Sequence, residues 1–245
     1  MGRKLIFLSD VHLYPANPSR AELFFGFVAR QRAEADAIYV LGDLFDYWSG
    51  AKQARRPGWR ALLDRLGELA RGGPPIRVLG GNRDYLLDDA SLAPCGIESL
   101  GLEHRFDRDG LRFCLVHGHQ QFPESWFSRA FLNLIQRPSV QWATRAVPGW
   151  FSLFTAQMMR RWRRLVTRKD PSHRQRYDPA AFLPIFDSGI DVVVCGHNHW
   201  AHDYSPELAR PGRRLIALGS WRTEPSYLEY AEGEFRLVDP GLRGR

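Results

Sequence analysis

The amino-acid sequence predicts an α/β fold in which short buried strands alternate with helices. Runs of four or five mostly apolar residues, rich in β-branched side chains, recur along the chain and end at glycine or polar residues. Stretches with apolar residues at helical spacing separate the first of these runs. At 245 residues, of which 44% are hydrophobic and 25% charged, the chain has the size and composition of one globular domain. Alternating strands and helices are typical of a layered α/β architecture.

Six of these runs are the predicted strands, and two stretches between them are predicted helices. The predicted strands are Lys4–Leu8, Ala37–Leu41, Ile76–Leu79, Phe113–Val116, Val192–Cys195 and Leu215–Leu218. The predicted helices are Arg20–Glu34 and Trp59–Arg71, the second of which carries leucines at helical spacing. The stretch from Leu215 to Val238 is expected to form hairpins rather than further strand–helix units.

The positive charge of the chain is concentrated in one segment. Residues 126–176 contain eleven Arg or Lys, a single acid (Asp170) and four of the eight tryptophans, within a chain of net charge +7. The segment therefore carries a formal charge of +10, and the rest of the chain about −3. We interpret residues 122–178 as a basic, aromatic-rich helical cap inserted into a single domain, 1–245. A solvated basic helical face is the alternative, and basic charge alone would also suit nucleic acid or an anionic membrane.

Several classes of protein are excluded by the composition. No run approaches the roughly 20 apolar residues that a membrane-spanning helix needs. The apolar stretch near the N-terminus is too short for a secretory signal, and Asp10 follows it directly. The three cysteines form no close pair, which argues against a disulfide scaffold or a CxxC zinc site. We expect a cytoplasmic protein that is peripheral on the inner face of the cell membrane.

Polar residues of the kinds that bind metals follow five of the six apolar runs. The five blocks are Asp10-Val11-His12, Gly42-Asp43-Leu44-Phe45-Asp46, Gly81-Asn82-Arg83-Asp84, His117-Gly118-His119 and Gly196-His197-Asn198-His199. Open α/β sheets bind their ligands at the carboxyl edge of the strands, so we expect these blocks to converge. Nitrogen and oxygen donors without thiolate suit Mn²⁺, Fe²⁺, Zn²⁺ or Co²⁺, and they are too many for one tetrahedral zinc ion. Two divalent ions that share a carboxylate fit better, whereas a metal-free polar cluster would be costly to bury.

As a set, the five blocks resemble the motifs of the calcineurin-like metallophosphoesterases, D-x-H, G-D-x-x-D, G-N-[HR]-[DE], H-G-[HD] and G-H-x-H. The resemblance implies a β-sandwich core flanked by helices, and a hydrolase that uses two metal ions. By this resemblance one ion would be held by Asp10, His12, Asp43 and His199, and the other by Asp43, Asn82, His117 and His197. Asp43 would then bridge the two ions. Asp46 and Asp84 are expected to orient metal ligands, and the role of His119 is left open.

Three further stretches are similar to one group within that family. AIYVLGDLFDYW (residues 37–48), GNRDYLL (81–87) and GSWRTEPS (219–226) resemble segments of the UDP-2,3-diacylglucosamine pyrophosphatases of lipid A biosynthesis. Those enzymes insert a helical cap between their H-G and G-H-x-H blocks, and the 80 residues from His117 to His197 leave room for one. The resemblance implies Mn²⁺-dependent hydrolysis of UDP-2,3-diacylglucosamine to UMP and 2,3-diacylglucosamine 1-phosphate. This chain departs from the usual H-G-D at His119, which leaves open another nucleotide or phospholipid diphosphate as substrate.

Asp43, Asn82 and Arg83 are the predicted catalytic residues, and Asn82 and Arg83 the predicted substrate contacts. Many relatives carry histidine at the position of Arg83, and histidine can donate a proton where arginine cannot. A planar, permanently charged guanidinium instead grips phosphate, which suits a leaving group that needs no proton. The alternative role for Arg83 is an ion pair with a neighbouring acid.

The expected partners follow from the substrate and from the basic segment. We expect a nucleotide-linked lipid substrate and an anionic membrane surface contacted through the cap. No nucleic-acid motif accompanies the basic segment, so no nucleic-acid partner is expected, and the oligomeric state is not predicted. A non-catalytic scaffold or membrane-binding protein on the same fold is the alternative of another class. Such a protein would have lost metal ligands, and none of the seven is missing.

Overall fold

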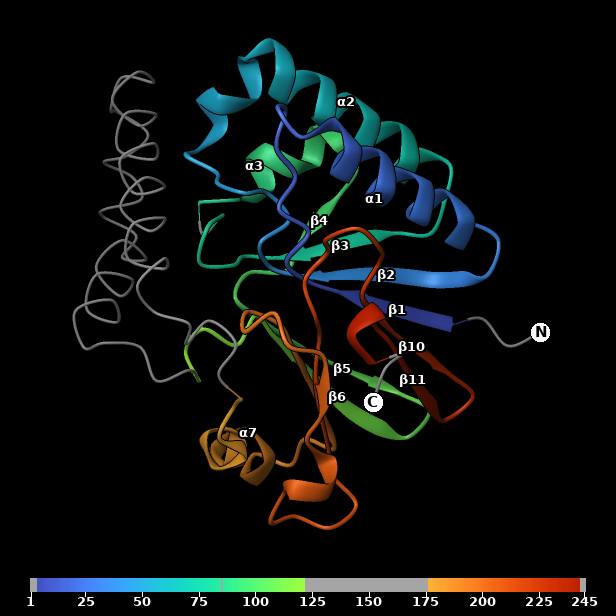
Figure 1. Cartoon of the computed structure of the whole chain (residues 1–245), viewed down its shortest axis with the longest axis vertical. Coiled ribbons are helices and arrows are strands. Elements are labelled where there is room, and N and C mark those ends of the chain that lie inside the picture. Colours follow the sequence, from blue (N-terminus) through green and yellow to red (C-terminus); the bar gives the residue numbers. More distant parts are fainter. Residues whose placement is uncertain (1–3, 85, 122–175, 243–245) are drawn as a thin grey trace.

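The computed structural model describes residues 4–84, 86–121 and 176–242, and these parts form two β-sheets that pack face to face (Figure 1). Helices cover the outer face of each sheet, so the described residues form four layers. The predicted α/β fold with a β-sandwich core flanked by helices is therefore confirmed. The predicted cap, 122–178, lies almost entirely outside the described residues and stays a prediction.

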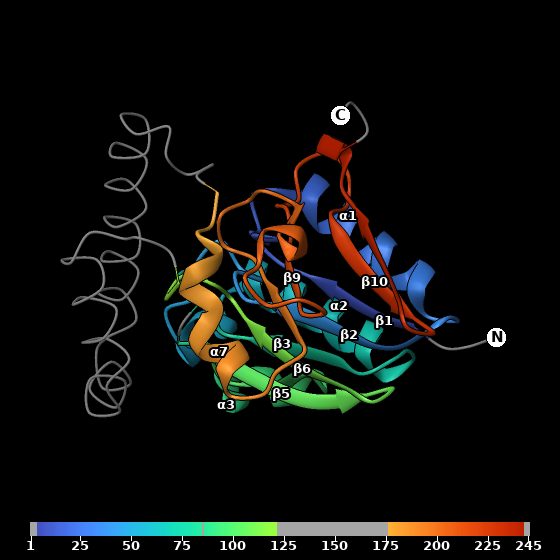
Figure 2. The same cartoon turned by 90° about the horizontal axis from the view of Figure 1, so that it is seen from below.

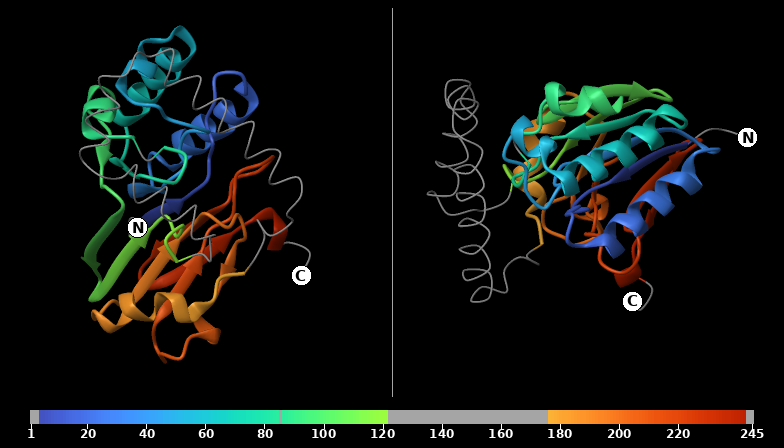
Figure 3. Two further views of the ribbon diagram at one scale, coloured as in Figure 1. Left: turned by 90° about the vertical axis from the view of Figure 1, so that its left-hand side faces the viewer. Right: turned by 90° about the horizontal axis from the view of Figure 1, so that it is seen from above.

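The first sheet has six strands in the order β11-β10-β1-β2-β3-β4. Its parallel strands are β1 (Lys4–Leu8), β2 (Ala35–Leu41), β3 (Ile76–Leu79) and β4 (Glu98–Ser99), and an antiparallel hairpin adds β10 (Tyr227–Ala231) and β11 (Glu234–Val238) beside β1. Its outer face carries α1 (Pro18–Gln31), α2 (Pro57–Arg71), α3 (Asp89–Leu92) and the short 3-10 helices η1 (Ala51–Arg55) and η2 (Ala93–Cys95). The right-hand view of Figure 3 shows α1 and α2 lying across this sheet.

The second sheet has five strands in the order β5-β6-β7-β9-β8. The strands are β5 (Glu103–Arg108), β6 (Leu111–Val116), β7 (Val192–Cys195), β9 (Arg214–Ala217) and β8 (His202–Asp203), of which β6, β7 and β9 run parallel. Its outer face carries η4 (Pro179–Phe182), α7 (Leu183–Asp187) and η5 (Ser205–Glu207), while η6 (Pro240–Leu242) follows the last strand. Figure 2 shows α7 beside this sheet, on the side away from α1 and α2.

The central strands bury both of their faces, which explains why the sequence reads as continuous apolar runs. In β1, Leu5 and Phe7 point into the layer between the sheets, whereas Ile6 and Leu8 point toward the helices. Successive side chains of a strand alternate in this way, so a strand covered on both sides needs apolar residues throughout. Between the sheets, the ring of Phe7 stacks on Tyr39 at 5.3 Å and on Phe113 at 6.2 Å.

The two predicted helices are present as α1 and α2 and differ from the prediction only at their ends, whereas the short helices α3 and α7 were not predicted. The first begins at Pro18 because the side chain of Asn17 caps it, accepting a hydrogen bond from the Arg20 N–H at 3.3 Å. It ends at Gln31, three residues before the predicted end, and its Phe24 and Phe27 rings pack on Trp221. The second helix begins two residues before its predicted start, at a proline that suits the first helical position.

Three strands were not predicted. Both β4 and β8 have only two residues, too few to give a pattern. Strand β5 is longer but alternates exposed and half-buried residues, because it lies at the edge of its sheet and only its inner face packs on the core. The predicted hairpin near the C-terminus is confirmed by the pairing of β10 with β11.

Candidate metal centre

The predicted metal ligands all follow strands whose carboxyl ends meet at one edge of the sandwich. They come after β1 (Asp10, His12), β2 (Asp43), β3 (Asn82), β6 (His117) and β7 (His197, His199). Backbone hydrogen bonds tie the first two loops together, from the Asp10 N–H to the Gly42 carbonyl at 3.2 Å and from the His12 N–H to the Asp43 carbonyl at 3.0 Å. Strand ends from both sheets thus contribute to one cluster.

Most of these residues have a backbone conformation that L-amino acids rarely adopt. Positive φ angles occur at Asp10 (55°), His12 (54°), Asp43 (52°), His197 (71°) and His199 (58°). Among the described residues, only Asp109 and Glu232 are further non-glycine examples, and each precedes a glycine in a hairpin turn. Such strained backbone typically persists at functional sites, where the surrounding structure enforces it. Here it occurs at five of the seven predicted ligands.

Asp10, His12 and His199 form the first group of converging donor atoms. The Nε2 atom of His199 lies 3.1 Å from Oδ1 of Asp10 and 3.3 Å from Nε2 of His12. The His12 Nε2 atom lies 3.8 Å from the same Asp10 oxygen. All three donor atoms are thus within 4.8 Å of one another, a spacing that can hold a metal ion.

Asp10, Asp43 and His117 form the second group. The His117 Nδ1–H donates a hydrogen bond to the Leu41 carbonyl at 2.7 Å, which leaves Nε2 as the nitrogen that faces the cluster. That Nε2 atom lies 3.7 Å from Oδ1 of Asp43, whose Oδ2 lies 3.9 Å from Nδ1 of His12. Asp43 thus belongs to the second group and also approaches His12 of the first, and Asp10 belongs to both groups.

His197, His119 and Asn82 lie around these two groups. The His197 ring packs edge-on against His117 at 5.2 Å, and its backbone N–H donates to Oδ2 of Asp10 at 2.8 Å. The buried ring of His119 lies 5.5 Å from that of His117 and 6.1 Å from that of His197. Asn82 is buried, with 8% of its surface exposed.

Several buried donor and acceptor atoms in this cluster lack a hydrogen-bond partner in the described parts of the chain. They are Oδ1 of Asp10, Nδ1 of His12, Oδ1 of Asn82 and Nε2 of His117. Leaving such an atom unsatisfied costs about 1–3 kcal/mol, and a bound ion is an ordinary partner for it. Carboxylate, imidazole and amide donors are the ligands that divalent first-row metals take. The residues therefore fit divalent metal ions, and Asp10, Asp43 and three of the histidines are positioned to bind them.

The electrostatics of Asp10 and His12 favour the protonation states that bind metal. Burial would lower the pKa of His117, but the carboxylates of Asp43 and Asp10 outweigh it and raise that pKa. Burial alone would raise the pKa of Asp10, but the imidazoles of His199, His117 and His12 outweigh it and hold that pKa well below its usual range. Burial, followed by the charge of Arg83, lowers the pKa of His12 well below its usual value. An ionised carboxylate and a neutral imidazole are the forms that donate to a cation.

Asp84 orients the loops through their backbone. Its Oδ1 accepts hydrogen bonds from the N–H groups of Gly81 at 2.7 Å and Asp43 at 3.1 Å, and its Oδ2 accepts one from Phe45 at 3.2 Å. Burial and the nearby charge of Asp43 raise the pKa of Asp84 to about 7. The predicted orienting role thus acts on main-chain N–H groups rather than on a ligand side chain.

Arg83 lies at the rim of the cluster. It forms an ion pair with a neighbouring acid, which was the alternative role predicted for it. Its Nη1 lies 2.9 Å from Oδ1 of Asp46, and its Nε lies 3.4 Å from Oδ2 of Asp43. The Arg83 backbone N–H also donates to Oδ1 of Asp43 at 2.9 Å. With 31% of its side chain exposed, the guanidinium reaches both solvent and the proposed bridging carboxylate.

Two glycines of the motifs are required by close packing. A Cβ atom at Gly81 would collide with the backbone nitrogen and the carboxylate of Asp43, and one at Gly196 would collide with the Ser9 side chain and Asp10. Ser9 was not among the predicted site residues, although its hydroxyl donates a hydrogen bond to the Leu41 carbonyl at 2.9 Å beneath the cluster. Its place directly before Asp10 was the available signal.

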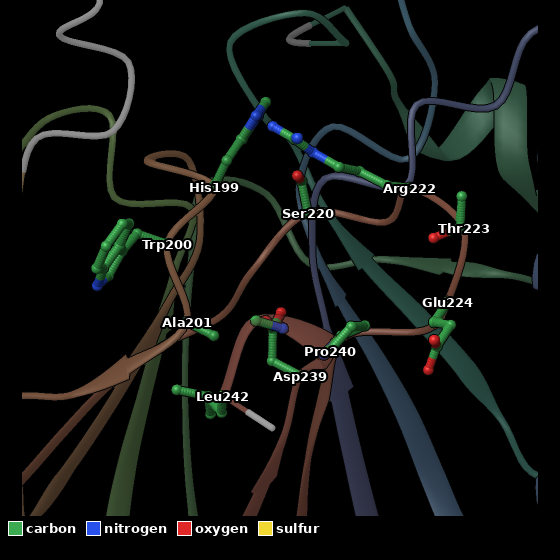
Figure 4. Close-up of a pocket in the computed structure, with 11 residues that line it drawn as sticks. His199, Trp200, Ala201, Ser220, Arg222, Thr223, Glu224, Asp239, Pro240 and Leu242 are labelled. Atoms are coloured by element: carbon green, nitrogen blue, oxygen red, sulfur yellow. The ribbon is translucent and has the colours of Figure 1, made fainter. Parts of the chain in front are cut away.

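A pocket of about 240 Å³ opens beside His199 (Figure 4). Its lining includes Trp200, Ser220, Arg222 and Thr223, from the loops that follow β7 and β9. Arg222 was not among the predicted site residues, because one arginine in a loop carries no distinctive pattern.

Within the ranges that the structure describes, no helix combines the length and apolar character that crossing a bilayer would require.

Comparisons with known proteins agree with this geometry. The family model described as Calcineurin-like phosphoesterase matches residues 3–201. The UDP-2,3-diacylglucosamine hydrolase of Actinobacillus succinogenes is 29% identical over 241 residues, which cover 96% of this chain and 98% of the relative. The relative of the same name from Yersinia enterocolitica is 26% identical, and the alignment covers 95% of this chain and 97% of the relative. The one from Edwardsiella ictaluri is 27% identical, with 96% of this chain and 91% of the relative covered.

Proposed function

Because the chain belongs to the calcineurin-like phosphoesterase family, we propose that it hydrolyses the pyrophosphate bond of UDP-2,3-diacylglucosamine to give UMP and 2,3-diacylglucosamine 1-phosphate. The observation that carries the proposal is the pair of possible metal-binding groups that share Asp10. Several buried donor and acceptor atoms in these groups have no hydrogen-bond partner in the described residues. Relatives with UDP-2,3-diacylglucosamine hydrolase as their name align over almost the whole chain and support this choice of substrate.

We further propose that two ions bind, with Mn²⁺ as the metal. Asp10, His12, Asp43 and His199 would hold one ion, and Asp43, Asn82, His117 and His197 the other. The position of Asp43 between His12 and His117 supports its bridging role. When bound, such ions supply positive charge to the phosphorus centre and make a water molecule easier to deprotonate.

The protein's own residues hold this arrangement and bind the phosphate. The Leu41 carbonyl fixes the ring of His117, and Asp84 fixes the backbone that carries Asp43. Asn82 and Arg83 would bind phosphate oxygens from the rim. Arginine donates no proton at neutral pH, which is adequate because hydrolysis of a pyrophosphate expels a phosphate monoester that needs none.

The basic segment, residues 122–178, is the part of the chain that we expect to contact lipid. We propose that it is a cap that accepts the acyl chains and brings the protein to the anionic inner face of the cell membrane, which would make a cytoplasmic protein peripheral to that membrane. Its eleven basic residues and four tryptophans support this role, since basic segments with aromatic residues bind anionic bilayer surfaces. No nucleic-acid partner is proposed.

The test is a product assay with purified protein, Mn²⁺ and UDP-2,3-diacylglucosamine in mixed micelles. The proposal predicts one UMP released per substrate consumed, and no release by the Asp43→Ala variant. It fails if no UMP appears while another nucleotide diphosphate conjugate is cleaved.

A second candidate function is hydrolysis of another nucleotide or phospholipid diphosphate. The observation that favours it is the buried His119, which lies against His117 and His197 where the resembling enzymes carry an aspartate. A substrate panel that includes UDP-N-acetylglucosamine and CDP-diacylglycerol distinguishes the two candidates through their relative kcat/KM values.

A further inference from the structure

Three arginines from separate segments of the chain lie near the metal-ligand cluster. Arg20 is in the first turn of α1, Arg83 follows β3, and Arg222 lies between β9 and β10. Arg83 is in direct contact with Asp43, 3.4 Å from its Oδ2. Burial lowers the pKa of Arg20, the charge of Asp46 raises it, and the charges of Arg83 and Arg222 lower it further, while Arg20 in turn lowers the pKa of His12. The Phe24 ring of the same helix packs on Trp221 at 5.7 Å, so the first turn of α1 lies beside the loop that carries Arg222.

Two of these arginines form no direct ion pair with a described residue, although the charge of Asp46 offsets part of the repulsion at Arg20. Neither Arg20 nor Arg222 pairs with an acid in the described residues, whereas Arg83 pairs with Asp46. The Nε atom of Arg20 is also buried and has no hydrogen-bond partner there. Burying a charged donor without a partner is costly, so an anion that binds between these side chains would be stabilised.

The place of Arg20 in its helix makes a purely structural role a poor explanation. Asn17 is the N-cap of α1, so Arg20 is the third residue of the helix, and the first turn contains no acid. The N-terminus of a helix carries partial positive charge and disfavours a cation. An arginine is therefore disfavoured at this position by the helix, Asp46 offsets only part of that cost, and the same partial charge would help to bind a further anion.

Arg222 faces the space next to the predicted ligands. It lines the same pocket of about 240 Å³ as His199, and Figure 4 shows its guanidinium extending toward the His199 ring. The Ser220 hydroxyl is turned toward the same region, whereas the carboxylates of Glu224 and Asp239 lie toward the other end of the pocket. The end of the pocket nearest the cluster thus presents hydrogen-bond donors.

We propose that Arg20 and Arg222, together with Arg83, bind the second phosphate of a diphosphate substrate and thereby select diphosphates over substrates with one phosphate. The inference rests on the proposed function, because it assigns a place to the phosphate that the metal centre does not hold. Planar guanidinium groups bind phosphate oxygens in pairs, and three of them, one from a helix and two from loops, match an oxyanion with several oxygens.

The kinetic test compares Arg20→Gln and Arg222→Gln with the wild type in the full-length, Mn²⁺-loaded protein. The substrates are UDP-2,3-diacylglucosamine, with two phosphates, and bis(p-nitrophenyl) phosphate, with one. Loss of one charge-assisted contact predicts a fall of about 10- to 100-fold in kcat/KM for the diphosphate and less than about threefold for the other substrate. Arg30→Gln, at an exposed position of the same helix, is the matched control and should change neither value. Arg222→Lys should recover part of the loss.

A binding measurement keeps the inference separate from the proposed function. Calorimetry with metal-free protein in EDTA measures the affinities for UDP and for UMP. The wild type should bind UDP at least about tenfold more tightly, and each glutamine variant should lose most of that difference while keeping its melting temperature. Equal losses on both kinetic substrates, or an unchanged preference for UDP in the variants, would overturn the inference. If the wild type cleaves only the one-phosphate substrate yet prefers UDP in the binding measurement, the proposed substrate is wrong and the arginine site stands.

Discussion

The Nε2 atoms of His12 and His199 lie 3.3 Å apart, although 187 positions separate the two residues in the chain. Burial keeps the pKa of His12 well below its usual value, so at neutral pH its ring is uncharged. One proton at most can lie between these two nitrogens, whereas a cation beside both of them, and beside Oδ1 of Asp10, would satisfy all three atoms. This contact is the local reason to expect a metal ion in the first donor group.

Replacing His199 by alanine should therefore remove metal before it affects the fold. The side chain is 25% exposed, so its loss leaves little buried space. We expect the affinity for Mn²⁺ at this position to fall by at least about 100-fold and the turnover with it, because a direct ligand is lost. Metal analysis after gel filtration measures the effect. His104→Gln, a change at a histidine outside the cluster, is the control, and equal metal content in all three proteins would contradict the assignment.

Asp84→Asn tests the link between the loop backbone and the metal centre. Asparagine keeps one acceptor oxygen where the carboxylate uses two to hold the N–H groups of Gly81, Asp43 and Phe45. We expect the free energy of unfolding to fall by about 1–3 kcal/mol and the metal affinity to fall as Asp43 loses its support. Urea denaturation and calorimetric metal titration measure the two effects.

The matched control for that variant is Asp88→Ala. Asp88 caps α3 by accepting a hydrogen bond from the Ser91 N–H at 3.0 Å, so its loss should cost about 0.5–2 kcal/mol of stability. It lies outside the cluster and should leave metal affinity unchanged. An Asp84→Asn protein that is destabilised but binds Mn²⁺ as tightly as the wild type would show that Asp84 serves the fold alone.

Arg83→Lys should separate charge from geometry at the rim. Lysine keeps the positive charge but loses the planar fork that can contact Asp46 and Asp43 while binding phosphate. We expect kcat/KM for the diphosphate to fall by about 10- to 100-fold, with metal content unchanged. Steady-state kinetics with the same metal loading provide the measurement. Unaltered kinetics would mean that the ion pair with Asp46 is the whole role of Arg83.

Binding to vesicles tests the proposed membrane role of residues 122–178. Each basic residue near an anionic surface contributes about 1 kcal/mol at low salt, and salt screens that attraction. We expect sedimentation with phosphatidylglycerol-containing vesicles at low salt, release at high salt, and no sedimentation with phosphatidylcholine alone. Changing Arg160, Arg161, Arg163 and Arg164 to glutamine should weaken the binding, whereas equal binding to both vesicle types would contradict the proposal.

Much of the fold was predictable because the central strands are covered on both sides. Continuous apolar runs such as Val192–Cys195 then coincide with strands, and the polar blocks that follow them mark the carboxyl edge of the sheets. The edge strand β5 escaped prediction because its exposed face carries charged residues such as Glu103 and Asp107, which dilute the apolar pattern.

The site divides in the same way into a predictable and an unpredictable part. Asp10, His12 and Asp43 follow strands inside short motifs, so the sequence itself indicates that they converge. Arg20 and Arg222 belong to an ordinary helix and an ordinary loop, and only the tertiary packing of α1 beside the β9–β10 connection brings them to the rim. The membership of Asp10 in both donor groups likewise depends on distances that spacing along the chain does not supply.

The most direct test of the central claim is a calorimetric titration of chelated protein with Mn²⁺, with turnover measured at each addition. The account predicts two ions bound per chain and activity that rises with their binding, with both lost in Asp43→Ala. Turnover that survives thorough chelation, or an Asp43→Ala protein with an undiminished rate, would contradict it.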